Sequence, residues 1–161
     1  MRILRRPTAV VALAVGALPG CTSGADSDGG CGPITREALD PAYLVHIIDD
    51  DLPVEYTSDP PTSGPHKPSP PDTGVVDGPL SRPVQVGILE RGDVLLQYSP
   101  ELSRSDRVAL EALAGDRVVV APGSDLPDTI VATAWRSKRV CGSLAIAEVE
   151  EFVAERSGQG P

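Results

Sequence analysis

The chain is poor in the residues that several classes of function require. Its 161 residues include one Phe, one Trp, three Tyr, two His and three Cys. So few aromatic rings argue against carbohydrate recognition, which depends on stacking platforms. The chain has no Cys-x-x-Cys pair for a zinc ribbon and no Gly-x-Ser-x-Gly turn for a serine hydrolase. We therefore expect a protein that is not an enzyme, with a hydrolase as the third-ranked interpretation.

Positive charge is also scarce. The formal net charge is −9, with 14 Lys and Arg against 23 Asp and Glu. Without the three arginines of residues 1–20, 11 basic residues face 23 acidic ones, which gives a net charge of −12. This balance argues against nucleic acid as a partner and against electrostatic binding to an anionic membrane surface.

No apolar run is long enough to cross a bilayer, but a short one lies near the N-terminus. Arg2, Arg5 and Arg6 precede an apolar stretch of about ten residues, 9–18, which is typical of a signal peptide. The stretch ends in Leu-Pro-Gly-Cys at 18–21, which resembles the bacterial lipobox. We predict a signal peptide over 1–20, a lipid anchor on Cys21 and an extracytoplasmic location on the membrane. General secretion is favoured over the twin-arginine route, which the Arg5-Arg6 pair leaves open.

The two remaining cysteines suggest how the exported part is stabilised. Cys31 and Cys141 form an even pair, and an oxidising compartment favours a disulfide between them. We expect a flexible Ser/Gly/Asp-rich tether over 21–30, one domain over 31–157 and a short tail over 158–161.

Pattern and turn residues predict an α+β domain. A strand-like run at 41–48 leads to residues 53–83, which hold nine of the 17 prolines and are expected to form a loop. Beyond the loop, the expected elements are a β-hairpin over 83–98, a helix over 103–114, strands over 117–121 and 129–135, and a helix over 145–155. The order β-β-α-β-β-α indicates a mostly antiparallel four-stranded sheet with two helices on one face.

Several segments resemble a family known as domain of unknown function 3105. The strongest is Tyr-Thr-Ser-Asp-Pro-Pro-Thr-Ser-Gly-Pro-His at 56–66. Weaker ones are Leu-Glu-x-Gly-Asp-Val at 89–94, Tyr-Ser-Pro at 98–100 and Thr-Ala-Trp at 133–135. The resemblance covers roughly residues 31–156. It implies an exported or membrane-anchored bacterial protein, without an assigned activity.

The family pattern also implies histidines that this chain lacks. Around 86–92 the pattern places a histidine on either side of Leu-Glu, whereas this chain keeps Leu89-Glu90 but has Val86-Gly87-Ile88 before it and Arg91 after it. Guanidinium groups do not ligate metals and repel cations. If the family binds a metal, this member is expected to have lost the site or rebuilt it differently.

His46 and His66 are the only histidines, and they allow two interpretations. Imidazoles are ligands for copper or zinc, and Glu90 offers a third donor, but the sequence shows no defined ligand spacing. The alternative is that both rings serve ordinary hydrogen bonds. We therefore rank a metal-binding protein second and expect no cofactor, with copper or zinc as the alternative.

The first-ranked interpretation is a non-catalytic binding or scaffolding module of the cell envelope, with an envelope protein as partner. Its contact surface is predicted in the proline-rich segment, at Tyr56, Pro60, Pro61, Ser63, Gly64 and Pro65. A hydrolase would instead recruit Ser63 and His66 with an aspartate.

Overall fold

The fold is a six-stranded sheet with helices on both faces. The computed structural model describes residues 30–48 and 53–161. The strands are β1 (Thr35–Arg36), β2 (Gly74–Val75), β3 (Val94–Tyr98), β4 (Val118–Pro122), β5 (Ile130–Ala134) and β6 (Ser137–Cys141). The helices are α1 (Arg82–Glu90), α2 (Arg104–Glu111) and α3 (Ile146–Arg156). The predicted signal peptide, Cys21 and all of the tether except Gly30 lie outside the described residues. No helix within the described ranges is long and apolar enough to span a membrane.

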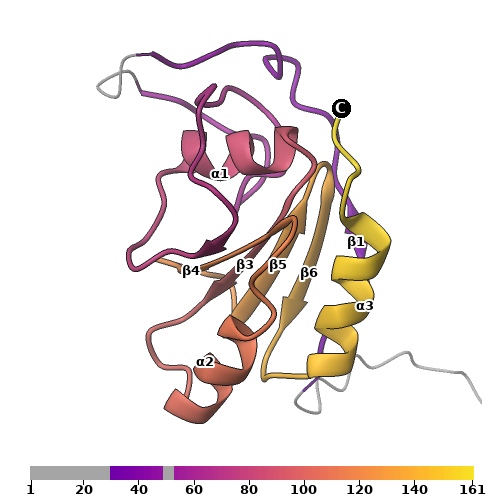
Figure 1. The fold of residues 1–161 in the computed structure, drawn as a ribbon. Coiled ribbons are helices and arrows are strands. Elements are labelled where there is room, and N and C mark those ends of the chain that lie inside the picture. The colour runs from indigo at the N-terminus through magenta and orange to yellow at the C-terminus, as the bar shows by residue number, and fades with distance from the viewer. Residues whose placement is uncertain (1–29, 49–52) are drawn as a thin grey trace, which may run out of the picture.

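The α+β class is confirmed, but the predicted four-stranded antiparallel sheet with two helices is wrong. The strand order is β1-β6-β5-β3-β4-β2. β3 pairs with β4 in parallel and β4 with β2 in parallel, while the other pairs are antiparallel. α2 connects β3 to β4, as a crossover between parallel strands requires (Figure 1).

The central strands are buried because both faces of the sheet are covered. All five residues of β3 and of β5 are buried. On one face, Leu96 of β3 packs in a cluster with Leu110 of α2 and Phe152 of α3. On the other face, Leu95 packs with Val86 and Leu89 of α1. A strand that is buried on both faces need not alternate between apolar and polar residues. The sequence of β3, Val-Leu-Leu-Gln-Tyr, accordingly shows no such alternation.

The predicted hairpin over 83–98 is wrong in its first half, which is helix α1. Ser81 stands at the N-cap position without a side-chain hydrogen bond, and Pro83 lies in the first turn, where the missing amide proton is tolerated. Val84, Val86 and Ile88 alternate as in a strand, but a run this short fits a helix equally well. Gly92, at φ 86°, follows the last turn of the helix and leads the chain into β3. β3 coincides with the second strand of the predicted hairpin, so that half of the prediction is confirmed.

Other elements divide between confirmed and missed. The predicted helix over 103–114 is α2, and Ser103 Oγ accepts a hydrogen bond from the Asp106 amide as its cap. β4, β5 and α3 also lie where they were expected. β6 was not predicted, and the strand predicted at 41–48 is a turn followed by one isolated bridge at His46.

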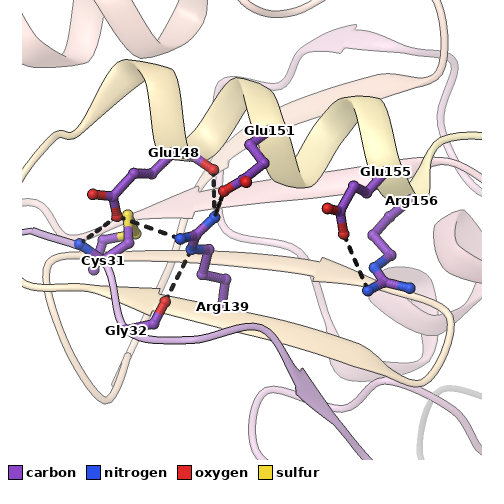
Figure 2. A network of polar contacts seen from close by, with 8 residues as sticks. Cys31, Gly32, Arg139, Glu148, Glu151, Glu155 and Arg156 are labelled. Carbon is purple, nitrogen blue, oxygen red and sulfur yellow. Dashed lines mark hydrogen bonds and ion pairs between the residues drawn. A yellow bond between two sulfur atoms is a disulfide. The ribbon is translucent and has the colours of Figure 1, made fainter.

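The start of the described domain is fastened to β6 and α3. The predicted Cys31–Cys141 disulfide is present, with a Cα–Cα distance of 3.9 Å. Next to it, Arg139 is 9% exposed and donates hydrogen bonds to the carbonyls of Gly32 (2.9 Å) and Glu148 (2.8 Å) (Figure 2). The Glu148 carboxylate in turn accepts from the Cys31 amide at 3.0 Å. A buried charge with this many acceptors is well compensated.

Candidate metal centre

Three side chains that can bind a metal meet beside the C-terminal end of α1. They are His46, His66 and Glu90, and their ligand atoms all lie within 4.8 Å of one another. Among the residues that the structure describes, no other group of three or more His, Cys, Asp or Glu side chains has this arrangement. Both candidate histidines from the sequence are therefore brought together, and Glu90 joins them.

The backbone fixes the two histidines side by side. His46 and His66 form an isolated parallel β-bridge. The His66 amide donates to the Val45 carbonyl at 3.0 Å, and the Ile47 amide donates to the His66 carbonyl at 2.7 Å. The imidazole centroids are 4.8 Å apart, at an interplanar angle of 85°. Because the main chain sets this pairing, the rings do not depend on each other for their position.

The hydrogen bonding of His66 exposes one nitrogen for a ligand. Its ring is fully buried, and Nδ1 lies 2.9 Å from the Gly64 carbonyl oxygen. That oxygen only accepts, so we assign the proton to Nδ1, which leaves Nε2 with a lone pair in the neutral ring. Histidines that ligate metals commonly donate their other N–H to a carbonyl in this way.

The free nitrogen of His66 faces a carboxylate. Nε2 lies 2.8 Å from Glu90 Oε2, yet it makes no hydrogen bond of acceptable geometry. In the neutral ring this contact sets a lone pair against a negative oxygen, which is unfavourable in a buried position. A cation between the two atoms, or a second proton on the ring, removes the conflict.

Glu90 reaches the histidines because α1 lies very close to the segment that carries His66. A Cβ on Gly87 would stand 2.4 Å from the Lys67 carbonyl oxygen, so only glycine allows this approach. The Lys67 amide also donates to the Pro83 carbonyl at 3.0 Å, at the other end of the helix. Gly87 is one turn before Glu90, and its importance was not visible in the sequence pattern.

The donor set suits a transition-metal ion. Two imidazole nitrogens and one carboxylate oxygen are ligands for zinc, copper or iron. Tetrahedral ligands about 2.1 Å from a metal lie about 3.4 Å apart. The distance of 2.8 Å between His66 Nε2 and Glu90 Oε2 is shorter than 3.4 Å, whereas the largest separation allowed among the three ligand atoms, 4.8 Å, is longer. Modest side-chain rotations would therefore bring the three atoms to the spacing of a coordination shell.

Arg91 does not bring an unpaired positive charge to the site. Its guanidinium forms an ion pair with Asp93, which is 3% exposed, and Nη2 donates to the Pro71 carbonyl at 2.9 Å. The repulsion expected from the sequence is reduced by this pairing. The site geometry forms without the two histidines that the family pattern places near Glu90.

The proline-rich segment is not the contact surface that the sequence suggested. Pro60, Pro61, Ser63, Gly64 and Pro65 are all buried, and Tyr56 is half-buried. That prediction is wrong because loop composition does not decide exposure here. The segment packs against the sheet and α1.

Specific polar contacts hold this segment in place. The Tyr56 hydroxyl donates to the Pro65 carbonyl at 2.8 Å, and Lys138 Nζ donates to the Asp59 carbonyl at 2.9 Å. Burial raises the pKa of Tyr56; Arg82 lowers this pKa and Asp40 raises it, both by smaller amounts. Burial lowers the pKa of Lys138. The segment thus acts as a rigid support for His66.

The contacts of Ser63 do not join it to His66. Ser63 Oγ accepts a hydrogen bond from the Asp40 amide at 2.9 Å, while the two His66 nitrogens face Gly64 and Glu90. A serine nucleophile needs a base within hydrogen-bond reach. This arrangement gives the hydrolase interpretation no support.

Comparison with known proteins agrees with the resemblance seen in the sequence. A family model described as "Protein of unknown function (DUF3105)" matches residues 48–161. No curated protein and no solved structure matches the chain. His46 lies just before the matched residues, whereas His66 and Glu90 lie within them.

Proposed function

The chain belongs to the DUF3105 family, whose function is unknown, and we propose that it is a lipid-anchored, extracytoplasmic protein that binds a divalent transition-metal ion. The ligands are His46, His66 and Glu90. The observation that carries the proposal is the buried His66 Nε2, which faces Glu90 at 2.8 Å without a hydrogen bond. A second proton on the ring would turn this contact into an ion pair, and a metal ion shared by the two atoms would satisfy both of them, as buried polar atoms require.

Copper(II) and zinc(II) are the ions that this donor set favours. Imidazole suits both, and for a given set of nitrogen and oxygen ligands the affinity for copper(II) exceeds that for zinc(II). The Gly64 carbonyl fixes the His66 tautomer and thereby prepares Nε2 for either ion. The interior position of His66 also limits competition from water.

Calorimetric titration of the oxidised mature protein with zinc(II) and copper(II) tests the proposal. We expect one ion per chain, with copper(II) bound more tightly. His46→Ala/His66→Ala should abolish binding, and Glu90→Gln should weaken it by about 10- to 100-fold. Glu150→Gln, which removes the same charge from an exposed position on α3, is the matched control and should bind as the parent protein does. Stoichiometric binding that survives the loss of both histidines would place the ion elsewhere, and absence of binding to the parent protein would refute the proposal.

The location outside the cytoplasm is supported by the N-terminal sequence and by the disulfide. Arg2, Arg5, Arg6 and the apolar run before Cys21 are typical of a lipoprotein signal peptide, and the Cys31–Cys141 bridge suits an oxidising compartment. An envelope protein as partner fits the same location.

Anchoring through Cys21 makes a separate prediction. Cys21→Ala removes the thiol that carries the lipid, so the protein should move from the membrane fraction to the soluble fraction of expressing cells. Immunoblots of the two fractions measure this shift, with Thr22→Ala as a neighbouring control that should stay in the membrane. Unchanged membrane partitioning of Cys21→Ala would exclude the anchor.

A further inference from the structure

The metal site proposed above is open on one side. Within residues 30–48 and 53–161 the cluster offers three ligand groups. Zinc and copper take at least four ligands in most protein sites, and sites with three protein ligands keep a position for an incoming group. His66 closes the inner side, because it is fully buried, whereas His46 is exposed and the Glu90 side chain is 36% exposed. A free coordination position would therefore face the surroundings of His46.

Exposed apolar side chains flank His46 along the chain. Leu44 is 75% exposed, Val45 48% and Ile48 89%, and we call these three residues the apolar rim. Half of the large hydrophobic residues found exposed in the described part of the chain belong to the rim, although it spans only five positions. His46 and Ile48 are both exposed and flank Ile47, which is buried, so exposure alternates along residues 46–48.

The rim is out of place on a protein of this composition. The chain is acidic, with a formal net charge of −9. Single apolar residues on a protein surface are common, but several of them close to one candidate ligand require an explanation. Ile47, between His46 and Ile48, is 7% exposed and holds the segment against the domain. The segment is thus held by the backbone hydrogen bonds to His66 and by the Ile47 side chain, while Leu44, Val45 and Ile48 stay exposed.

We propose that the remaining ligand comes from a second protein, which docks on the apolar rim and inserts a histidine between flanking apolar side chains. This inference rests on the proposed metal binding. Water or a small anion would fill the open position without any use for Leu44 or Ile48, whereas an apolar peptide segment would bury both. Histidine is favoured over cysteine as the donor because thiols are oxidised in the compartment that the disulfide indicates.

Shared coordination of this kind suits transfer of the ion between two proteins. The incoming imidazole would bind the metal at the open position before any of the three resident ligands leaves. His46 is the ligand best placed to leave first, since it is exposed and His66 is enclosed. The step exchanges ligands only and changes neither the charge of the metal nor its oxidation state.

Cobalt(II) provides the test, because its visible absorption bands report the ligands around it. The mature protein loaded with cobalt(II) is titrated with imidazole, with the peptide acetyl-Leu-His-Leu-amide and with acetyl-Leu-Ala-Leu-amide. We expect the first two to change the bands and the third to leave them unchanged. The histidine peptide should bind about tenfold more tightly than imidazole, since it also buries apolar surface on the rim.

Variants separate coordination from docking. Leu44→Ser/Ile48→Ser should remove the tenfold advantage of the peptide and keep the response to imidazole. Val108→Ser, which alters another exposed apolar residue on α2, should change neither. A peptide that binds no more tightly than imidazole, or an advantage that survives in Leu44→Ser/Ile48→Ser, would refute docking on the rim.

The failure of this inference is distinguishable from the failure of the proposed function. If cobalt(II) binds and neither imidazole nor the histidine peptide changes its bands, no open position exists and the inference is wrong, while metal binding stands. If the parent protein takes up no cobalt(II), zinc(II) or copper(II), both are wrong.

Discussion

Gly87→Ala is expected to lower the free energy of unfolding by about 2 kcal/mol, although alanine favours helices. The new Cβ would stand 2.4 Å from the Lys67 carbonyl oxygen, and that atom belongs to the backbone and cannot rotate away. Overpacking of a closed contact typically costs about 1–3 kcal/mol and occasionally more, and it outweighs a gain of about 1 kcal/mol in helix propensity. Urea unfolding monitored by circular dichroism measures the change.

The same substitution should weaken metal binding about 10- to 100-fold, a size typical of lost supporting contacts around a metal. Displacing α1 moves Glu90, which lies one turn further along, away from His66. Gly78→Ala is the matched control, because a Cβ there meets nothing within 4 Å. If Gly87→Ala stabilised the protein, as expected for an exposed helical position, the close approach of α1 would be incorrect.

Removal of the disulfide is the second large effect. Cys31→Ala/Cys141→Ala opens a crosslink between residues 110 positions apart. In the chain-entropy model, a loop of this length contributes about 4–5 kcal/mol to the free energy of unfolding. Alanine is the replacement of choice because Cys141 is fully buried and a serine hydroxyl would lack a partner there.

Chemical reduction of the parent protein should reproduce this loss, with urea unfolding as the measurement. A decrease below about 1 kcal/mol would show that the contacts of Arg139 and Glu148 hold residues 31 and 32 without the disulfide. Metal affinity should not change in protein that remains folded, because no contact of the bridge involves His46, His66 or Glu90.

The parts of the fold that were predicted are those with strong local signals. α2 has a capping serine, and α3 has apolar residues at helical spacing. The β5–β6 hairpin was missed because its turn uses Trp135 and Arg136, and Arg136 adopts φ 55°, a conformation for which glycine or asparagine is the usual signal. β1 and β2 have two residues each, which is too few for any periodic pattern.

The site could be predicted only in its residue types. His46 and His66 stood out as the only histidines, but their pairing is a parallel bridge across 20 positions, which no local pattern encodes. Glu90 belongs to the site because 82–90 is helical, whereas the predicted hairpin placed it in a turn. The burial of Pro60 and Pro61 depends on packing against the sheet, which proline content does not reveal.

The disulfide also fixes the place on the domain from which the chain leads back toward residue 21. Cys31 pairs with the end of β6 that leads to α3, whereas α1, whose last residue is Glu90, lies at the opposite end of the sheet (Figure 1). Nine residues lie between Cys21 and Cys31, and ten residue-to-residue steps reach at most about 36 Å. A lipid anchor on Cys21 would therefore be joined to the domain at the pole opposite the proposed metal site, so the site would lie away from the point of attachment.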